Sequence, residues 1–200
     1  MQKITEIETL ETLYGAPVAR SLTKVATRIT PLYRDWITAA KFLVLSTAGP
    51  EGTDASPRGD DGPVVHIADE HTLWLPDWRG NNRIDSLRNI VRDPRVSLMF
   101  MVPGCNNVVR VNGTAFLTAD EAARAAFARN SLLPATVAVI TVEELYFQCA
   151  KALMRSRLWD TSGERPAVPT AGQFLKEQEE AFEAEAYDAG YAEYAKTRMW

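Results

Sequence analysis

The stretch Leu75-Pro-Asp-Trp-Arg-Gly-Asn-Asn-Arg-Ile-Asp-Ser-Leu-Arg-Asn-Ile90 predicts the end of a strand, a tight polar turn and the first turns of a helix. The Gly-Asn-Asn run at 80–82 indicates the turn, because these residues accept unusual backbone angles or offer side-chain hydrogen bonds. From Arg83 onward the apolar side chains follow helical spacing, at Ile84, Leu87, Ile90 and Val91. The Asp93-Pro94 pair ends the helix, since proline disfavours the α conformation in the residue before it.

The start of this helix is a predicted phosphate site. Unpaired backbone N–H groups and the positive end of the helix dipole are expected just after Asn82, with Arg83 and Ser86 one turn apart on one face. Residues 79–95 include five arginines and only two acids, although the formal net charge of the chain is −4. The planar guanidinium group suits phosphate recognition, whereas an ordinary exposed helix is the alternative explanation.

A second candidate segment is Asp54-Ala-Ser-Pro-Arg-Gly-Asp-Asp-Gly62. Ser56 and Arg58 alternate along an extended chain, so both side chains are expected on the same side of a sheet. The glycines at 59 and 62 permit close approach of a ligand or of another strand. An ordinary polar loop is the alternative, and Asp60 and Asp61 are expected to be solvated.

The composition is that of a soluble globular domain with appendages, with 46% hydrophobic and 24% charged residues in a chain of 200. A pI of about 5.3 argues against general binding of nucleic acid, which requires a broad basic surface. The charged N-terminal residues lack the apolar region of a signal peptide, and no apolar run approaches the roughly 20 residues that cross a bilayer. We therefore expect a cytoplasmic protein that binds neither nucleic acid nor membrane.

Two cysteines and two histidines do not have the spacing of a disulfide framework or of a zinc site, so no metal is expected. The sequence also offers no nucleophile–base pair of the hydrolase type, and we expect Cys149 to be unreactive. Hydrolytic chemistry is therefore a poor interpretation.

Apolar runs and turn signals predict short strands with helices at both ends of the chain. Strands are expected over 42–47, 53–57, 63–68, 72–76, 95–102, 107–118 and 136–142, and helices over 3–14, 17–28, 31–41, 120–130 and 147–158. Buried apolar positions on the first helices are expected at Leu22, Val25, Ile29, Leu32, Trp36 and Ile37. Strands without regular strand–helix alternation favour a closed or nearly closed antiparallel barrel.

These elements suggest four parts. Residues 1–34 form an N-terminal helical segment, 35–160 the barrel domain, 161–172 a linker, and 173–200 a C-terminal helix with an apolar and aromatic stripe.

Several motifs follow one another along the chain. They are Asp54-Ala-Ser-Pro-Arg-Gly-Asp60, Leu75-Pro-Asp77, the segment from Gly80 to Ile90, Asp93-Pro-Arg-Val96, Pro103-Gly104, Val109-Arg-Val-Asn-Gly113 and the segment from Gln148 to Trp159. Together they resemble the pyridoxamine 5′-phosphate oxidase-like, FMN-binding split-barrel family. The resemblance covers roughly residues 35–160.

The resemblance implies a mainly β (α+β) fold: a six-stranded antiparallel split β-barrel with flanking N- and C-terminal helices. It implies a homodimer with FMN in each of two clefts at the subunit interface. The residues that it assigns to the cofactor are Asn82, Arg83 and Ser86 at the phosphate, Ser56 and Arg58 beside the phosphate and the isoalloxazine ring, Trp78 and Asn81 near the ring, and Gln148, Lys151 and Arg155 of the partner subunit.

The implied function is an FMN-dependent oxidoreductase that acts on a small molecule, with the flavin supplying the redox chemistry. The family's authentic oxidases close their site with a Trp…Arg-Leu-x-Pro segment. Here the corresponding region reads Tyr194-Ala-Lys-Thr-Arg-Met-Trp200, so we expect a substrate other than pyridoxamine phosphate. Two alternatives stay open: a non-enzymatic flavin or haem carrier on the same barrel, with His66 as the haem ligand, and a deazaflavin-dependent reductase, which would need more basic residues near the cleft.

Overall fold

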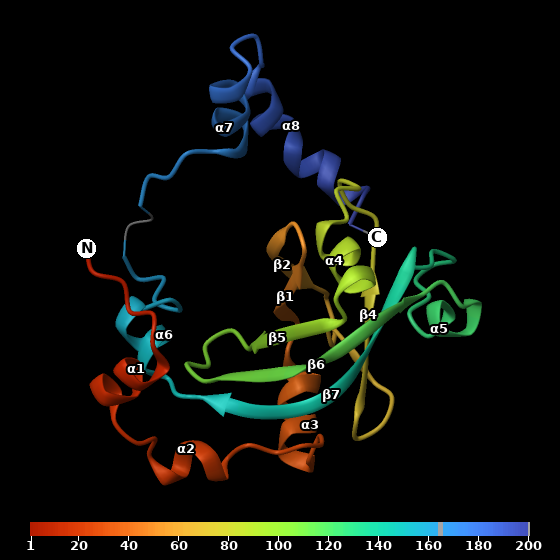
Figure 1. Cartoon of the computed structure of the whole chain (residues 1–200). Coiled ribbons are helices and arrows are strands. Elements are labelled where there is room, and N and C mark those ends of the chain that lie inside the picture. Colours follow the sequence, from red (N-terminus) through yellow and green to blue (C-terminus); the bar gives the residue numbers. More distant parts are fainter. Residues whose placement is uncertain (164–165, 200) are drawn as a thin grey trace.

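The structure is a computed structural model that describes residues 1–163 and 166–199 (Figure 1). In these ranges seven strands form one antiparallel sheet in the order β2-β1-β5-β6-β7-β4-β3. The strands are β1 (Phe42–Gly49), β2 (Gly52–Gly59), β3 (His66–Ile67), β4 (Thr72–Asp77), β5 (Arg95–Met101), β6 (Val108–Thr118) and β7 (Thr136–Gln148). The predicted antiparallel α+β class is confirmed. The seven strands correspond to the seven that the sequence pattern predicts, and they are one more than the six that the resemblance implies, because the two-residue β3 pairs with β4.

The described residues also form eight helices. They are α1 (Ile7–Tyr14), α2 (Ala19–Thr23), α3 (Pro31–Ala39), α4 (Asp85–Arg92), α5 (Glu121–Ala125), α6 (Lys151–Ser156), α7 (Ala171–Gln178) and α8 (Ala184–Lys196). Within residues 1–163 and 166–199, no helix combines the length and the apolar character needed to cross a bilayer.

The second N-terminal helix, α2, is shorter than the sequence pattern predicts, because it ends at Thr23 and the chain then pairs with β7 at Ala26. Ala26 exchanges backbone hydrogen bonds with Leu145 of β7, at 2.9 and 2.8 Å. Helical spacing therefore no longer applies, and the expected buried stripe on this helix is wrong. Leu22 and Val25 are exposed, and only Ile29, the last residue of the stripe, is buried.

Other helix boundaries also differ from the prediction. The helix α1 begins at residue 7 rather than 3, α5 ends at 125 rather than 130, and α6 spans 151–156 instead of 147–158 because β7 continues to residue 148. Asp120 caps α5 as expected, since its carboxylate accepts a hydrogen bond from the Ala123 amide at 3.1 Å. One helix was predicted over 173–200, but α7 and α8 are separate helices; Trp200 lies outside the described residues.

Alternating apolar side chains of the strands fill the inside of the curved sheet. The largest fully buried ones in the strands are Leu43, Leu45, Leu73, Leu98, Phe100, Val109, Val111, Val137, Ile140 and Leu145. Helix α3 lies against this core through the buried Ile37 and the half-buried Trp36, as expected. Leu32 is exposed, so its predicted inward orientation is wrong.

The pairing of β6 with β7 is interrupted by a bulge at Asn112 and Gly113. Here the two backbones approach so closely that a Cβ on Gly113 would lie 1.9 Å from the Thr141 carbonyl oxygen. A residue without a side chain is therefore required at this bend.

Gly113→Ala is expected to lower the free energy of unfolding by about 3 kcal/mol or more, because the added methyl collides with backbone that the sheet holds in place. Urea denaturation followed by circular dichroism measures the loss. Gly62→Ala is the matched control, since a Cβ there meets open space, and it should change the stability by less than about 1 kcal/mol. Equal stability of the two variants would contradict the close approach at the bulge.

Candidate functional site

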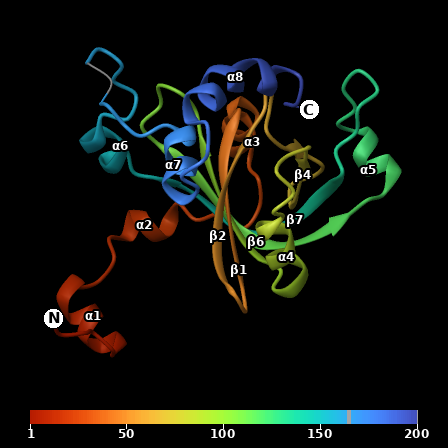
Figure 2. The ribbon, with the colours of Figure 1, turned by 90° about the horizontal axis from the view of Figure 1, so that it is seen from above.

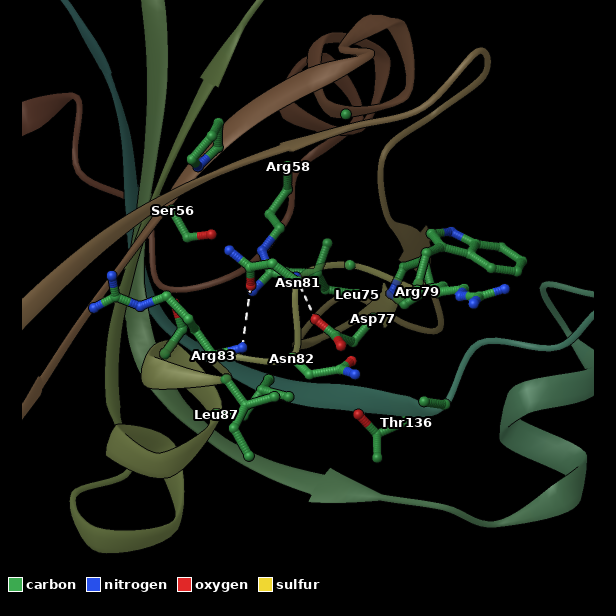
Figure 3. Close-up of a pocket in the computed structure, with 18 of the residues that line it drawn as sticks. Ser56, Arg58, Leu75, Asp77, Arg79, Asn81, Asn82, Arg83, Leu87 and Thr136 are labelled. Atoms are coloured by element: carbon green, nitrogen blue, oxygen red, sulfur yellow. Dashed lines mark hydrogen bonds and ion pairs between the residues drawn. The ribbon is translucent and has the colours of Figure 1, made fainter. Parts of the chain in front are cut away.

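A cleft of about 1320 Å³ lies between β2, the end of β4, the turn at residues 78–84 and the start of α4 (Figure 3). Seven of the ten sequence-predicted cofactor residues line it: Ser56, Arg58, Trp78, Asn81, Asn82, Arg83 and Ser86. The start of β7 and the loop before it complete the wall, with Thr136, Ala135, Leu132 and Leu133. The two segments that the sequence singled out therefore meet at one site.

Strand β2 directs its polar side chains into the cleft. Asp54, Ser56 and Arg58 are half-buried and alternate with exposed neighbours, which is the two-residue period of a strand. Figure 3 shows Ser56 and Arg58 projecting from β2 toward the turn that follows β4. The prediction that these two side chains share one side of the sheet is confirmed.

Arg58 joins two strands that are far apart in the sheet. Its Nη1 forms an ion pair and hydrogen bond with the Asp77 carboxylate at the end of β4, and these side chains are 20% and 18% exposed. The Nε of Arg58 and the hydroxyl of Thr136 are buried and, within the described part of the chain, have no hydrogen-bond partner. Because buried polar atoms are rarely left without a partner, these two atoms are candidates for contacts to a polar ligand.

Helix α4 begins later than predicted, at Asp85 rather than at Arg83. Asn82 and Ile84 have left-handed backbone angles, with φ of 62° and 52°, and the Asn81 side chain accepts a hydrogen bond from the Arg83 amide at 3.1 Å. The polar turn expected here is thus present, but it extends two residues further. A left-handed conformation is costly for a β-branched residue such as Ile84, and such strain is found mainly at functional sites.

The buried face of α4 is largely polar. Ser86 and Asn89 are buried together with Ile90, and Leu87 is half-buried, whereas the other two apolar residues at helical spacing, Ile84 and Val91, are exposed.

Hydrogen bonds to two strands explain this face. The Ser86 hydroxyl donates to the Asp54 carboxylate on β2, and the Asn89 amide donates to the Thr47 hydroxyl on β1 at 3.1 Å. Gly49 lets the helix approach β1, because a Cβ there would lie 2.4 Å from the Asn89 side-chain oxygen.

The first turn of α4 is open to an anion. Ile84 stands at the N-cap position and its side chain has no atom that could accept a hydrogen bond, so no side chain caps the helix. Backbone N–H groups of the first turn and the helix dipole therefore remain available for a phosphate. Arg83 adds a guanidinium that is 77% exposed and bonded through Nε to the Asp85 carboxylate at 2.9 Å.

The charges in the cleft are nearly balanced, although the local sequence is rich in arginine. The lining includes the cations Arg58, Arg79 and Arg83 and the acids Asp54, Asp60, Asp77 and Asp85. Asp54 and Asp77 line the cleft although neither was predicted as a site residue. The alternation of 54, 56 and 58 along one strand was the signal for Asp54, and no local signal identified Asp77.

The Asp60 side chain is buried, contrary to expectation, whereas that of Asp61 is largely exposed, as predicted. Both form ion pairs with Arg129, from the loop before β7, and the Asp60 side chain is only 6% exposed. Burial, followed by a hydrogen bond with Asp61, raises the pKa of Asp60, whereas hydrogen bonds to Asp60 and then Arg129 lower the pKa of Asp61. The Arg129 guanidinium also lies 6.0 Å from the centre of the Trp78 ring. This group ties the end of β2 to the far wall of the cleft.

Three predicted residues lie elsewhere in this chain. Gln148 ends β7, and Lys151 and Arg155 belong to α6, which Figures 1 and 2 show well away from α4. The resemblance assigns them to the cleft of the partner subunit, and this assignment stays a prediction. His66 also lies outside the cleft, on β3, where its ring is 5.4 Å from that of Trp74.

A comparison with protein families identifies the family of this chain. A family model described as pyridoxamine 5′-phosphate oxidase matches residues 29–149, which include all seven strands. None of the curated proteins compared with the chain matches it.

Solved structures with a similar fold are more distant in sequence. A variant of HupZ from Group A Streptococcus, in which one histidine is replaced by alanine, is 19% identical with a TM-score of 0.51, and the match covers 60% of this chain and 99% of that one. A second HupZ structure from Group A Streptococcus is 22% identical with a TM-score of 0.49, over 60% and 93% of the two chains. General stress protein 26 from Bacillus anthracis is 18% identical with a TM-score of 0.43, over 57% and 88%. The first of these supports the fold alone.

Asp85→Asn is expected to strengthen the binding of inorganic phosphate about 3-fold or more, because it frees Arg83 and removes a negative charge from the first turn of α4. Isothermal titration calorimetry with phosphate measures the change. Asp93→Asn is the matched control: Asp93 holds Arg95 through the same kind of contact, Nε to carboxylate at 2.9 Å, and neither residue lines the cleft. Equal effects of the two substitutions would show that phosphate does not bind at the start of α4.

Proposed function

The chain belongs to the pyridoxamine 5′-phosphate oxidase family, and on this basis we propose that it is an FMN-binding flavoprotein and an oxidoreductase that acts on a small molecule. The observation that carries the proposal is the convergence of Ser56, Arg58, Asn82 and Arg83 on one cleft next to an uncapped helix start. These residues come from separate segments, and each is of a type that binds phosphate or polar ring atoms.

The residues present fit FMN. Arg83, Asn82 and the amides of the first turn of α4 would hold the phosphate, and the ring would lie toward Trp78 and Asn81. For Ser86 we propose a positioning role in place of the expected phosphate contact, because its buried hydroxyl donates a hydrogen bond to Asp54 and so holds the helix start against β2. A cleft of about 1320 Å³ is larger than most small-molecule pockets, so it has room for a cofactor and a substrate together.

A bound flavin would supply electron or hydride transfer, and the chain would bind and orient it and set the polarity around its ring. If the flavin supplies the reactive group and the protein binds it, the protein does not need a nucleophile–base pair, and none was found in the sequence. The near balance of arginines and aspartates in the cleft favours FMN over a deazaflavin cofactor with a longer acidic tail. The position of His66 outside the cleft favours a flavin over haem.

We also propose that the protein is a cytoplasmic homodimer. Gln148, Lys151 and Arg155 of the partner subunit would then complete each cleft. Lys151 and Arg155 lie four residues apart on α6, so they share one helix face and would present two positive charges to the cofactor.

The purified protein is expected to be yellow, with absorption near 450 nm (about the wavelength of an oxidised flavin), and mass spectrometry of the released chromophore should identify FMN. Bleaching by NADH or NADPH, followed by reoxidation with an acceptor, would support an oxidoreductase over a carrier. Arg83→Ala should weaken FMN binding about 10- to 100-fold, because a charge-assisted hydrogen bond to the phosphate is lost, and it should leave riboflavin binding unchanged.

Arg88→Ala is the control for this variant, since Arg88 is exposed on the same helix and does not line the cleft. A colourless protein that binds neither FMN nor riboflavin on addition would disprove the proposed function. An Arg83→Ala protein with wild-type affinity for FMN would disprove only the position of the phosphate.

Mixed dimers test the partner's contribution. Arg83→Ala and Arg155→Ala should each weaken FMN binding, because every cleft of either homodimer lacks one cofactor residue. In a refolded one-to-one mixture, half of the dimers carry both variants and one of their two clefts is intact. About a quarter of all clefts should therefore regain tight binding of FMN, measured by fluorescence titration. If no cleft in the mixture regains tight FMN binding, Arg155 of the partner does not complete the cleft. Wild-type FMN affinity of the Arg155→Ala homodimer would also place Arg155 outside the site.

A further inference from the structure

Helix α8 carries a continuous aromatic face. Tyr187, Tyr191 and Tyr194 are spaced by four and three residues, and their neighbouring ring centres lie 5.9 and 6.4 Å apart. Phe182 extends this row at 5.5 Å from Tyr187. The charged residues Glu185, Glu193 and Lys196 belong to the opposite face. The helix is therefore two-sided, although it is acidic in composition.

The aromatic face reaches the candidate cofactor site. Helix α8 lies above the sheet in Figure 1, and in the view from above it lies on the α3 side of β1 and β2 (Figure 2). Tyr191 lines the same cleft as Ser56, Arg58 and Asn81, and so does Met199 beyond the helix end. A single element distant in sequence thus forms the outer wall of the cleft.

Helix α7 fixes the orientation of α8. Asp188 of α8 accepts a hydrogen bond from the Gly172 amide at 2.9 Å and another from the Thr170 hydroxyl at the start of α7. Gly172 allows close contact, because a Cβ there would lie 2.5 Å from the Ala184 carbonyl oxygen. These contacts hold α8 in a defined position against the start of α7, through Asp188 and the backbone at Ala184.

The barrel leaves these rings largely uncovered. Tyr191 is 52% exposed and Tyr194 is 56% exposed. Between the described residues of α8 and the strands there is no hydrogen bond or ion pair, so the helix is not a structural brace of the sheet. Tyr191 is the ring of this row that lines the polar cleft, and a half-exposed aromatic ring in this position is suited to stacking on a flat molecule.

We propose that α8 covers the ring end of the cleft and that Tyr191 packs against the isoalloxazine ring of the bound flavin. The proposal rests on the proposed function, because FMN is the ligand whose phosphate lies at the start of α4. Tyr191 is then a residue that selects a planar aromatic ligand, and it acts independently of the residues that hold the phosphate. Covering the ring also excludes water from one side of it, which strengthens the polar contacts beneath.

FMN and riboflavin distinguish the two kinds of contact, since they share the ring and differ in the phosphate. Tyr191→Ala is expected to weaken the binding of both flavins equally, by about 3- to 10-fold, as the loss of one aromatic stacking contact predicts. Arg83→Ala should weaken FMN alone. Tyr194→Ala is the matched control, because Tyr194 has the same side chain, the same helix and nearly the same exposure, and does not line the cleft. Tyr191→Phe keeps the ring and should keep wild-type affinity.

These titrations test whether Tyr191 contacts the flavin ring. Affinities of Tyr191→Ala within two-fold of wild type for both flavins would overturn the proposal and leave the proposed function standing. A wild-type protein that binds neither flavin would overturn both together. A Tyr191→Ala protein with unchanged flavin affinity but a dissociated dimer would assign the aromatic face to a second copy of the chain instead.

Discussion

The contact between Arg58 and Asp77 is the constraint on which the site depends. Strand β2 is one edge of the sheet and β4 is next to the other edge, so this ion pair spans the gap that the strand pairing leaves open. Arg129 makes a second link, from the loop before β7 to Asp60 and Asp61 after β2. If β2 and the end of β4 moved apart, Arg58 and Asp77 would each become a largely buried charge without a partner. The cost of such a charge stabilises the closed arrangement of the two strands.

Helix α4 illustrates how polar contacts position a binding element. An apolar helix face tolerates small shifts, whereas the hydrogen bonds of Ser86 to Asp54 and of Asn89 to Thr47 require a defined position and rotation. They fix the uncapped first turn beside β2, where a phosphate would be received. The left-handed residues before the helix follow from this placement, because the chain must turn sharply from β4 into α4.

Because positive and negative side chains in the cleft nearly balance, an anion would be bound by short-range contacts and not by long-range electrostatic attraction. Aspartates are partners of Arg58 and Arg83 and neighbours of the phosphate position, so the cleft has no large positive field. Affinity for an anion would therefore come from aligned donors at short range. Aromatic contact from α8 would then add ring recognition that does not depend on charge or on salt concentration.

Features that depend on near neighbours could be predicted from the sequence: the antiparallel strands, the turn at 80–82, the Asp120 cap and the shared side of Ser56 and Arg58. Motifs in order also identified the family. The true start of α4 and its largely polar buried face could not be predicted, because their partners Thr47, Gly49 and Asp54 lie more than thirty residues away in the chain. The same holds for Asp77 opposite Arg58 and for Tyr191 at the cleft, since periodicity reports which side a residue faces, whereas packing of the whole chain determines what it meets there.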